Sequence, residues 1–88
     1  FACKFTNAIF RQKAGIGGRT WTPSIRLNGS GAADWTGTGQ SSTTSWAVYR
    51  ETMSKTYAAD DRLRAIVSTG GVAENHQAEL VLIGYFTP

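Results

Sequence analysis

The residues of this sequence that are best suited to covalent chemistry are few and scattered. His76 is the single histidine, Cys3 is the single cysteine, and Asp60 and Asp61 are adjacent acids. A serine–histidine–acid site must bring three such groups within hydrogen-bond reach. The segment around His76, residues 72–79 (VAENHQAE), is typical of a polar turn before a strand and carries no nucleophile-elbow pattern. We therefore interpret His76 as a solvated loop residue and Cys3 as a small core residue, and predict no catalytic residue and no enzymatic activity.

Metal and cofactor sites are also not predicted. One cysteine and one histidine fall short of the four soft ligands of a structural zinc site. Adjacent side chains on a strand point to opposite faces, so Asp60 and Asp61 indicate a turn with solvated acids. The glycine-rich stretches 13–18 (KAGIGG) and 68–71 (STGG) lack the GK[ST] ending of a phosphate-binding loop. We interpret both stretches as turns.

The sequence predicts mainly β-strands as its regular elements. Apolar residues alternate with polar ones in residues 1–12, 19–27 and 62–68, and residues 78–86 (AELVLIGYF) form the clearest strand. Because a proline cannot donate a ladder hydrogen bond, we expect the second strand to lie at a sheet edge or to begin after Pro23.

Two segments are harder to assign. Residues 28–45 are rich in Gly, Ser and Thr and open with the turn signal Asn28-Gly29, so we expect a long loop that is functional or disordered. Residues 45–58 fit an alternating strand, and they also fit a helix in which Trp46, Tyr49, Met53 and Tyr57 make one stripe. The fold class expected is all-β, a small antiparallel sandwich or partly open barrel, with one short helix in 45–58 left open. Residues 1–88 are expected to form a single β-rich domain.

The length of the chain points to association with other subunits. A domain of 88 residues buries a limited share of its surface, and small domains often gain support from disulfides, metals or partner subunits. A single cysteine allows no internal disulfide, so we expect a homo-oligomer. Phe1 in first position indicates a processed product or a piece of a longer polypeptide. No apolar run reaches the length of a membrane span, so none is expected.

The charge is unevenly distributed along the chain. Residues 1–33 hold five basic residues and no acid, whereas residues 34–88 hold four basic and six acidic residues. The five basic residues alternate with aromatic ones in a way that could serve a nucleic acid as a charged groove with stacking platforms. The net charge of +3 is low for tracking phosphates, so nucleic acid is an alternative and not the expected partner. The basic residues are Lys4, Arg11, Lys13, Arg19 and Arg26, with Phe5, Phe10 and Trp21 between them.

Aromatic side chains carry the binding hypothesis. Trp, Tyr and Arg dominate the energetics of protein interfaces, and aromatic faces also suit sugar rings. We expect Trp21 and Trp46 to lie in the core, because both sit in apolar patterns. Trp35 lies in the middle of the polar loop, and we predict that it contacts a ligand. Tyr49, Arg50 and Tyr57 are predicted to contact the same ligand.

Residues 18–27 (GRTWTPSIRL) supply a family resemblance. Trp21-Thr22-Pro23, with Gly18 before them, resemble the opening motif, G-x-W-T-P, of small terminal domains of bacteriophage tail fibres and tailspikes, although two residues instead of one separate the glycine from the tryptophan here. The order of loop 28–45, segment 46–50 and final apolar strand is similar to that of these domains, whereas the sequence departs from them after residue 50. The resemblance implies a virion component, a homotrimer and recognition of a cell-surface polysaccharide or protein, with no catalytic residue.

The function expected is therefore that of a non-enzymatic domain at a virion surface or outside the cell. It would associate with copies of itself and with neighbouring virion subunits, and it would bind a host-surface glycan or protein. The alternatives are a structural capsid or tail component without a ligand of its own, a secreted sugar-binding lectin, and a nucleic-acid-binding module.

Overall fold

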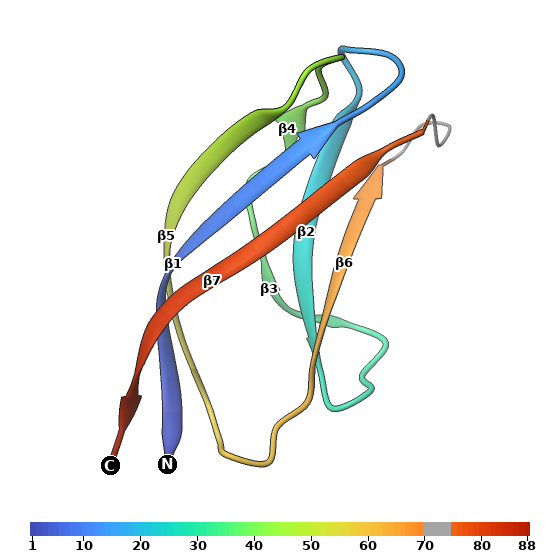
Figure 1. The fold of residues 1–88 in the computed structure, drawn as a ribbon. Coiled ribbons are helices and arrows are strands. Elements are labelled where there is room, and N and C mark those ends of the chain that lie inside the picture. Colours follow the sequence, from blue (N-terminus) through green and yellow to red (C-terminus); the bar gives the residue numbers. More distant parts are fainter. Residues whose placement is uncertain (70–74) are drawn as a thin grey trace.

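The computed structural model describes residues 1–69 and 75–88, and every regular element in these ranges is a β-strand. The strands are β1 (Ala2–Lys13), β2 (Thr20–Leu27), β3 (Ala33–Thr36), β4 (Gln40–Ser41), β5 (Ala47–Tyr57), β6 (Leu63–Thr69) and β7 (Gln77–Thr87), as Figure 1 shows. They form two antiparallel sheets that do not close into a barrel, so the all-β prediction is confirmed. The described part of the chain has no helix of the length and hydropathy that a membrane span needs.

The first sheet has the order β5-β1-β7, with β1 in the centre. Alternation along β1 is interrupted at one point. Its pairing with β7 passes from Phe5–Gly84 to Asn7–Ile83, which leaves Thr6 as an extra residue in a bulge. A side chain at residue 84 would overlap the backbone carbonyl of Lys4, so the close approach at the bulge requires glycine there.

The second sheet centres on β2, with β6 on one side and β3 and β4 on the other. The expectation that this strand lies at an edge or starts after Pro23 is wrong, because Pro23 sits inside a central strand. The carbonyl of Pro23 accepts a hydrogen bond from Gly37 N at 2.8 Å, so its backbone polar atoms face the β3/β4 side. The pairing with β4 ends at Trp21 and that with β3 begins at Ser24. The missing N–H of Pro23 therefore falls in the gap between two short strands, where no ladder bond is lost.

Residues 45–58, which were open between strand and helix, form strand β5. Tyr49, Met53 and Tyr57 all point into the interior, where Met53 and Tyr57 are buried. A spacing of four residues is two strand periods and also about one helical turn, so these three residues share a face in either element. Trp46 belongs to the helical stripe only, and it lies outside the core with 45% of its surface exposed. The prediction of Trp46 as a core residue is therefore wrong.

The segment expected as a loop over residues 28–45 is partly ordered into β3 and β4. It opens with a tight turn in which Asn28 and Gly29 both have positive φ (51° and 76°) and Ser30 N donates to Leu27 O at 3.0 Å. This geometry is a type I′ turn, which confirms the Asn-Gly signal. The turn predicted at Gly70-Gly71 lies outside the described residues.

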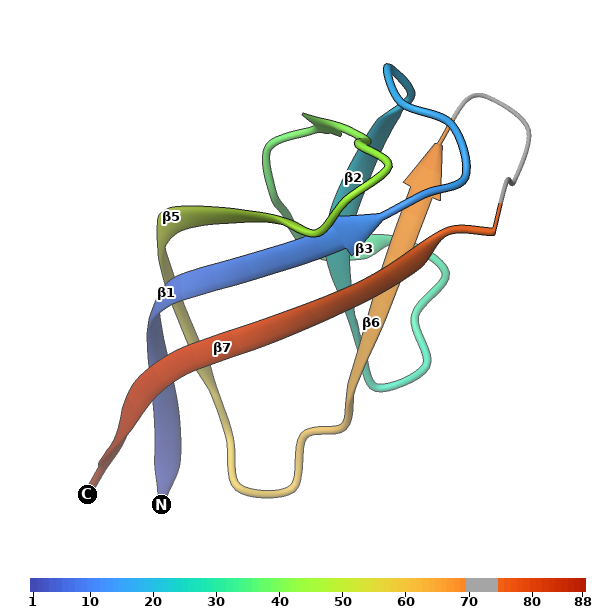
Figure 2. The same ribbon diagram turned by 45° about the horizontal axis from the view of Figure 1, so that its top comes forward.

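The two sheets pack face to face, and Figure 2 shows β1 and β7 crossing over β2 and β6. The core between them is small. Its buried cluster consists of Ala8, Ile25, Met53 and Tyr57, with Phe5, Leu27, Trp35, Leu80 and Leu82 packed against it. Toward the edge strand β6 the interior becomes accessible to water, because Leu63 faces inward and is still 38% exposed. A core of this size gives the domain little apolar burial of its own.

Candidate interaction surfaces

The structure places Trp35 on β3, with its indole packed against the core cluster. A Cβ at Gly37 would lie 2.8 Å from Cη2 of Trp35 and 2.9 Å from Cγ of Pro23, so the loop closes tightly over this ring. Glu51 holds the loop from β5, because its carboxylate accepts hydrogen bonds from Thr38 N (2.9 Å) and Thr38 Oγ1 (3.0 Å). Trp35 therefore fixes the loop to the body of the domain and is half-buried.

The other three predicted binding residues do not gather around Trp35 as one exposed site. Tyr49 points inward, and its hydroxyl donates to Ser41 O at 2.9 Å while its ring lies 6.5 Å from that of Phe10. Tyr57 is buried in the core cluster. Arg50 is exposed on the outer face of the same strand. Two of the three thus face the interior and one faces solvent on the opposite side of the sheet.

The hydroxyl of Tyr57 joins the two sheets. It donates to Oδ2 of Asp34 on β3 at 3.0 Å, and Lys55 Nζ lies 3.5 Å from the same oxygen. Burial raises the pKa of Tyr57 to about 12, and the hydrogen bond and negative charge of Asp34 add to the effect. The phenol is therefore a permanent donor at neutral pH, and its role here is structural.

His76 is not the solvated loop residue that the sequence indicates. Its ring stacks on Trp21 with centroids 3.7 Å apart and planes inclined by 7°, and its Nε2 lies 2.8 Å from Oε1 of Gln12. The amide nitrogen of the fully buried Gln12 donates to the carbonyls of Gln40 and Ser41, both at 3.1 Å. The Gln12 oxygen is left to accept, so Nε2 of His76 carries the proton. Burial lowers the pKa of His76, which favours the neutral ring.

This arrangement gives His76 a role between the sheets. His76 lies directly before β7, and its ring connects this end of the strand to Gln12 of β1 and Trp21 of β2. In residues 1–69 and 75–88, no serine hydroxyl or thiol hydrogen-bonds to it, and no group of three metal-ligating side chains occurs. Cys3 is a free, half-buried thiol. Glu74, the neighbouring acid noted in the sequence, lies outside the described residues.

The adjacent acids form the predicted turn. Asp61 accepts a hydrogen bond from Ala58 N at 2.7 Å and another from Asn28 Nδ2 at 3.0 Å. Asn28 in turn accepts from Arg62 N at 2.8 Å. Asn28, Gly29, Asp60 and Arg62 line a shallow depression of about 270 Å³. Its polar groups mostly serve to close the end of the second sheet.

The aromatic residues on which the nucleic-acid alternative depends do not line a charged groove. Phe5, Phe10 and Trp21 all point into the interior, where they cannot stack on bases. Arg11 points outward, pairs with Glu79 at 3.6 Å, and lies 4.7 Å above the ring of Trp46. Alternation along the strands separates the aromatic residues from the basic ones.

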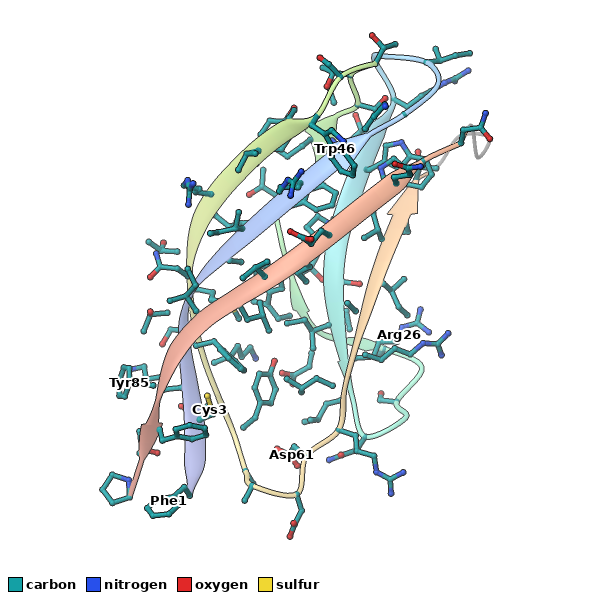
Figure 3. All side chains as sticks on the ribbon, in the orientation of Figure 1. Phe1, Cys3, Arg26, Trp46, Asp61 and Tyr85 are labelled. Atoms are coloured by element: carbon teal, nitrogen blue, oxygen red, sulfur yellow. The ribbon has the colours of Figure 1, made fainter. Side chains whose placement is uncertain are left out.

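The outer face of the first sheet carries a row of apolar side chains beside its β7 edge. We call this row the apolar stripe, and it consists of Ile9, Val81, Ile83 and Tyr85. Ile9 lies directly opposite Val81 in the β1–β7 register. Val81, Ile83 and Tyr85 follow one another along the same face and are 39%, 47% and 52% exposed. Figure 3 shows Tyr85 projecting outward near the lower end of β7. Exposed apolar groups gathered on one face mark interaction surfaces.

The outer face of the second sheet has a different composition. Hydroxyl-bearing residues and arginines occupy the outward positions of β2 and β6, among them Thr22, Ser24, Arg26, Arg64 and Ser68. Figure 3 shows Arg26 on the opposite side of the view from Tyr85. The molecule therefore presents two chemically distinct outer faces.

Comparisons with known proteins add no relative: no family model, no curated protein and no solved structure matches this chain. The inferences about function therefore rest on the geometry of the two faces.

The apolar stripe was not predicted, although the sequence contains a pattern that indicates it. In residues 78–86 both parities are apolar, with Leu80 and Leu82 on one face and Val81 and Ile83 on the other. A strand of a sandwich needs only one apolar face, so the second apolar face indicates a surface that requires its own cover.

Proposed function

We propose that this chain is a non-enzymatic structural domain that assembles with copies of itself, as a homotrimer of the tail-fibre type at a virion surface. The observation that carries the proposal is the apolar stripe on the outer face of the first sheet. Packing the stripes of sister copies around a common axis would remove from water Val81, Ile83 and Tyr85, which the isolated domain leaves about half exposed.

The dimensions of the domain are sufficient for such an interface. Its longest two extents are 44 and 24 Å, and a stable protein interface buries roughly 800 Å² on each partner. The first sheet is built from the longest strands of the domain, β1, β5 and β7 of 12, 11 and 11 residues, which Figure 1 shows running side by side.

The charges around the stripe also favour a copy of the chain as the occupant. Between Leu80 and Pro88 the chain carries no charged side chain, so the β7 part of the stripe brings no charge of its own, while Lys4 opposite Tyr85 and Arg50 opposite Ile9 lie at its border. At one end the Arg11–Glu79 pair neutralises itself within the subunit. Charged residues at the borders of an apolar patch are typical of a polar rim.

The test compares two substitutions that flank the same residue. Ile83 and Thr52 both lie opposite Asn7, one on β7 and one on β5, and both side chains are exposed on the outer face. We expect the 88-residue chain to sediment as a trimer, and Ile83→Lys to weaken association by at least about tenfold, because it removes an apolar contact and buries a charge. Thr52→Lys is the matched control and should leave the sedimentation of the trimer unchanged.

Two results would contradict the proposal. A wild-type chain that sediments as a monomer at high concentration would remove the interface altogether. Equal weakening by Ile83→Lys and Thr52→Lys would show that the apolar stripe has no special part in association. Far-UV circular dichroism of both variants checks that each retains its strands.

Recognition of a host glycan or protein through loop 28–45 stays a prediction. Because Trp35 packs on the core, the Trp35→Ala substitution can also destabilise the fold. Glycan binding by this variant should therefore be measured together with its thermal stability. A glycan array that binds the wild type and a folded Trp35→Ala variant equally would remove Trp35 from the ligand site.

A further inference from the structure

The outer face of the second sheet contains a pair of arginines that lie directly opposite each other. In the antiparallel register, Arg26 of β2 faces Arg64 of β6. Ile25 and Leu27, the neighbours of Arg26 on β2, point into the core, so Arg26 and Arg64 both point outward. Opposite residues of an antiparallel pair have Cα atoms roughly 4.5–5.5 Å apart, and like charges in this position are destabilising.

Neither guanidinium is neutralised by an acid of the described residues. The two ion pairs that the structure shows there join Arg11 to Glu79 and Lys55 to Asp34, both outside this pair. The Nε of Arg26 is buried and has no hydrogen-bond partner. An unsatisfied buried donor costs free energy, and two opposed cations without an acidic partner stabilise an anion bound between them at the surface.

The outward positions of β2 and β6 around the pair carry hydroxyl groups and no acid, whereas Asp60 lines a depression with Arg62 at the end of the sheet. The outward positions of β2 and β6 near the pair hold Thr22, Ser24, Ile66 and Ser68. Asp60 and Asp61 lie in the turn before β6, where Asp61 is engaged by Asn28 and Ala58. Arg62 follows that turn and adds a third cation at this end of the face.

From this geometry we infer that Arg26 and Arg64 form an oxyanion site for one phosphate of a nucleic-acid backbone. Two guanidinium groups on opposed strands converge on a single phosphate, whose oxygens accept from their N–H forks. The absence of aromatic side chains on the outward positions of β2 and β6 argues against the stacking of sugar rings or bases. The contact therefore recognises backbone charge and not sequence.

A single phosphate contact is weak, but it is repeated in every copy of the chain. An oligomer that presents several such sites to one nucleic acid strand gains avidity from effective concentration. The site itself does not depend on the proposed assembly, since both arginines come from one subunit.

The experiment measures binding of a short fluorescent single-stranded oligodeoxynucleotide to the 88-residue chain at low salt by anisotropy. Arg64→Thr should weaken binding by about tenfold, since it removes one charged hydrogen-bond donor set from the phosphate. The matched control is Arg50→Thr, which removes the same charge from an exposed position on the outer face of the other sheet. It should weaken binding less than twofold.

Further arms separate the site from general charge attraction and from other anions. Arg64→Lys keeps the charge and loses the fork, so its affinity should fall between those of wild type and Arg64→Thr. Equal losses in Arg64→Thr and Arg50→Thr would overturn the site, because net charge alone would then explain binding. Binding of a sulfated polysaccharide with no binding of the oligonucleotide would also overturn it, as would an absence of binding to both.

The assembly and the phosphate contact fail in distinguishable ways. If the wild-type chain is monomeric and still binds the oligonucleotide through Arg64, the assembly proposal fails and the phosphate site stands. If the chain is trimeric and the oligonucleotide does not bind, the phosphate site fails and the assembly stands.

Discussion

The two outer faces of this sandwich carry different chemistry: the first belongs to the long strands β1, β5 and β7, and the second to the shorter strands β2 and β6 with β3 and β4. On the first sheet Val81, Ile83 and Tyr85 expose apolar surface beside the β7 edge. On the second sheet the Arg26–Arg64 pair exposes cations among hydroxyl groups. Since each inner face is already committed to the shared core, the difference between the outer faces lies in surface that the core does not use. The apolar face suits a protein surface and the cationic face suits an anion.

The largest effects are expected when the outward residues of one face are substituted and the other face is left unchanged. We expect Val81→Lys/Ile83→Lys to weaken self-association by at least about a hundredfold, since two apolar contacts are lost, while oligonucleotide binding by each subunit is retained. Arg26→Thr/Arg64→Thr should do the reverse. Analytical ultracentrifugation and anisotropy on both double variants measure the two effects. If either variant loses both properties while remaining folded, the faces are not separate sites.

Salt should move the two interactions in different ways. Affinity for nucleic acid falls with salt, with a log–log slope of about −0.7 to −0.9 for each phosphate contacted. Burial of apolar surface carries no such dependence and is strengthened by salts such as sulfate. Sedimentation and anisotropy between low and physiological salt should therefore show a stable oligomer that releases the oligonucleotide. An oligomer that dissociates as salt rises would indicate an electrostatic interface instead of the apolar stripe.

Relief of charge repulsion gives a smaller effect on stability. Arg64→Thr should raise the melting temperature of the unliganded chain by roughly 1 to 5 °C, because the opposition of like charges on adjacent strands is removed. Arg50→Thr again serves as the control, because Arg50 lies opposite Ile9 and not opposite another cation. A melting temperature that rises equally in both variants would assign the gain to net charge or to the strand preference of threonine.

The contact between His76 and Trp21 joins the two sheets, and its pH dependence should be a smaller effect. The folded state lowers the pKa of His76 below its usual value of 6.5. The unfolded chain therefore takes up a proton before the folded one does, and the free energy of unfolding should decrease as pH falls below about 6.5. Urea unfolding at several pH values tests this, with His76→Phe as the variant that keeps an aromatic ring on Trp21 and cannot titrate. An identical pH dependence in that variant would exclude His76 as its source.

Alkaline pH tests the other polar bridge between the sheets. The pKa of Tyr57 is raised to about 12, so the stability that depends on its protonated hydroxyl is complete below pH 10 and is lost as pH rises through about 12. Ultraviolet absorbance of tyrosinate should show one late step near that pH in the folded chain. Tyr57→Phe should lack that step, and its persistence would assign it to another tyrosine.

Local patterns predicted most of the strands but not the contacts between them. The period of two in residues 62–68 predicted β6, whose Leu63, Ala65 and Val67 lie opposite Leu27, Ile25 and Pro23 of β2. Period two also placed β1 and β7, although the bulge at Thr6 changes the parity within β1 and has no signal in residue type. Pro23 was misplaced because its tolerance depends on a gap between β3 and β4, which no local rule describes.

The side chains that join the sheets were hardest to foresee. His76 meets Gln12 across 64 residues of sequence, and a polar segment around a histidine normally indicates exposure. Trp35 and Tyr57 were selected for their chemistry, and the fold uses them in or against the core. The arginine pair depends on the register between β2 and β6, which the pattern within either strand does not predict.

The bulge between Phe5 and Asn7 affects the pairing of further chains with the exposed edge of β7. A straight strand edge with a run of uncharged residues is a template for fibril growth. Here β7 bends where Gly84 meets the bulge, and Figure 1 shows the lower part of the strand turning away from the upper part. Copies cannot stack on such a curved edge indefinitely in register. We therefore expect the bend to disfavour in-register fibril growth along the exposed apolar strand β7.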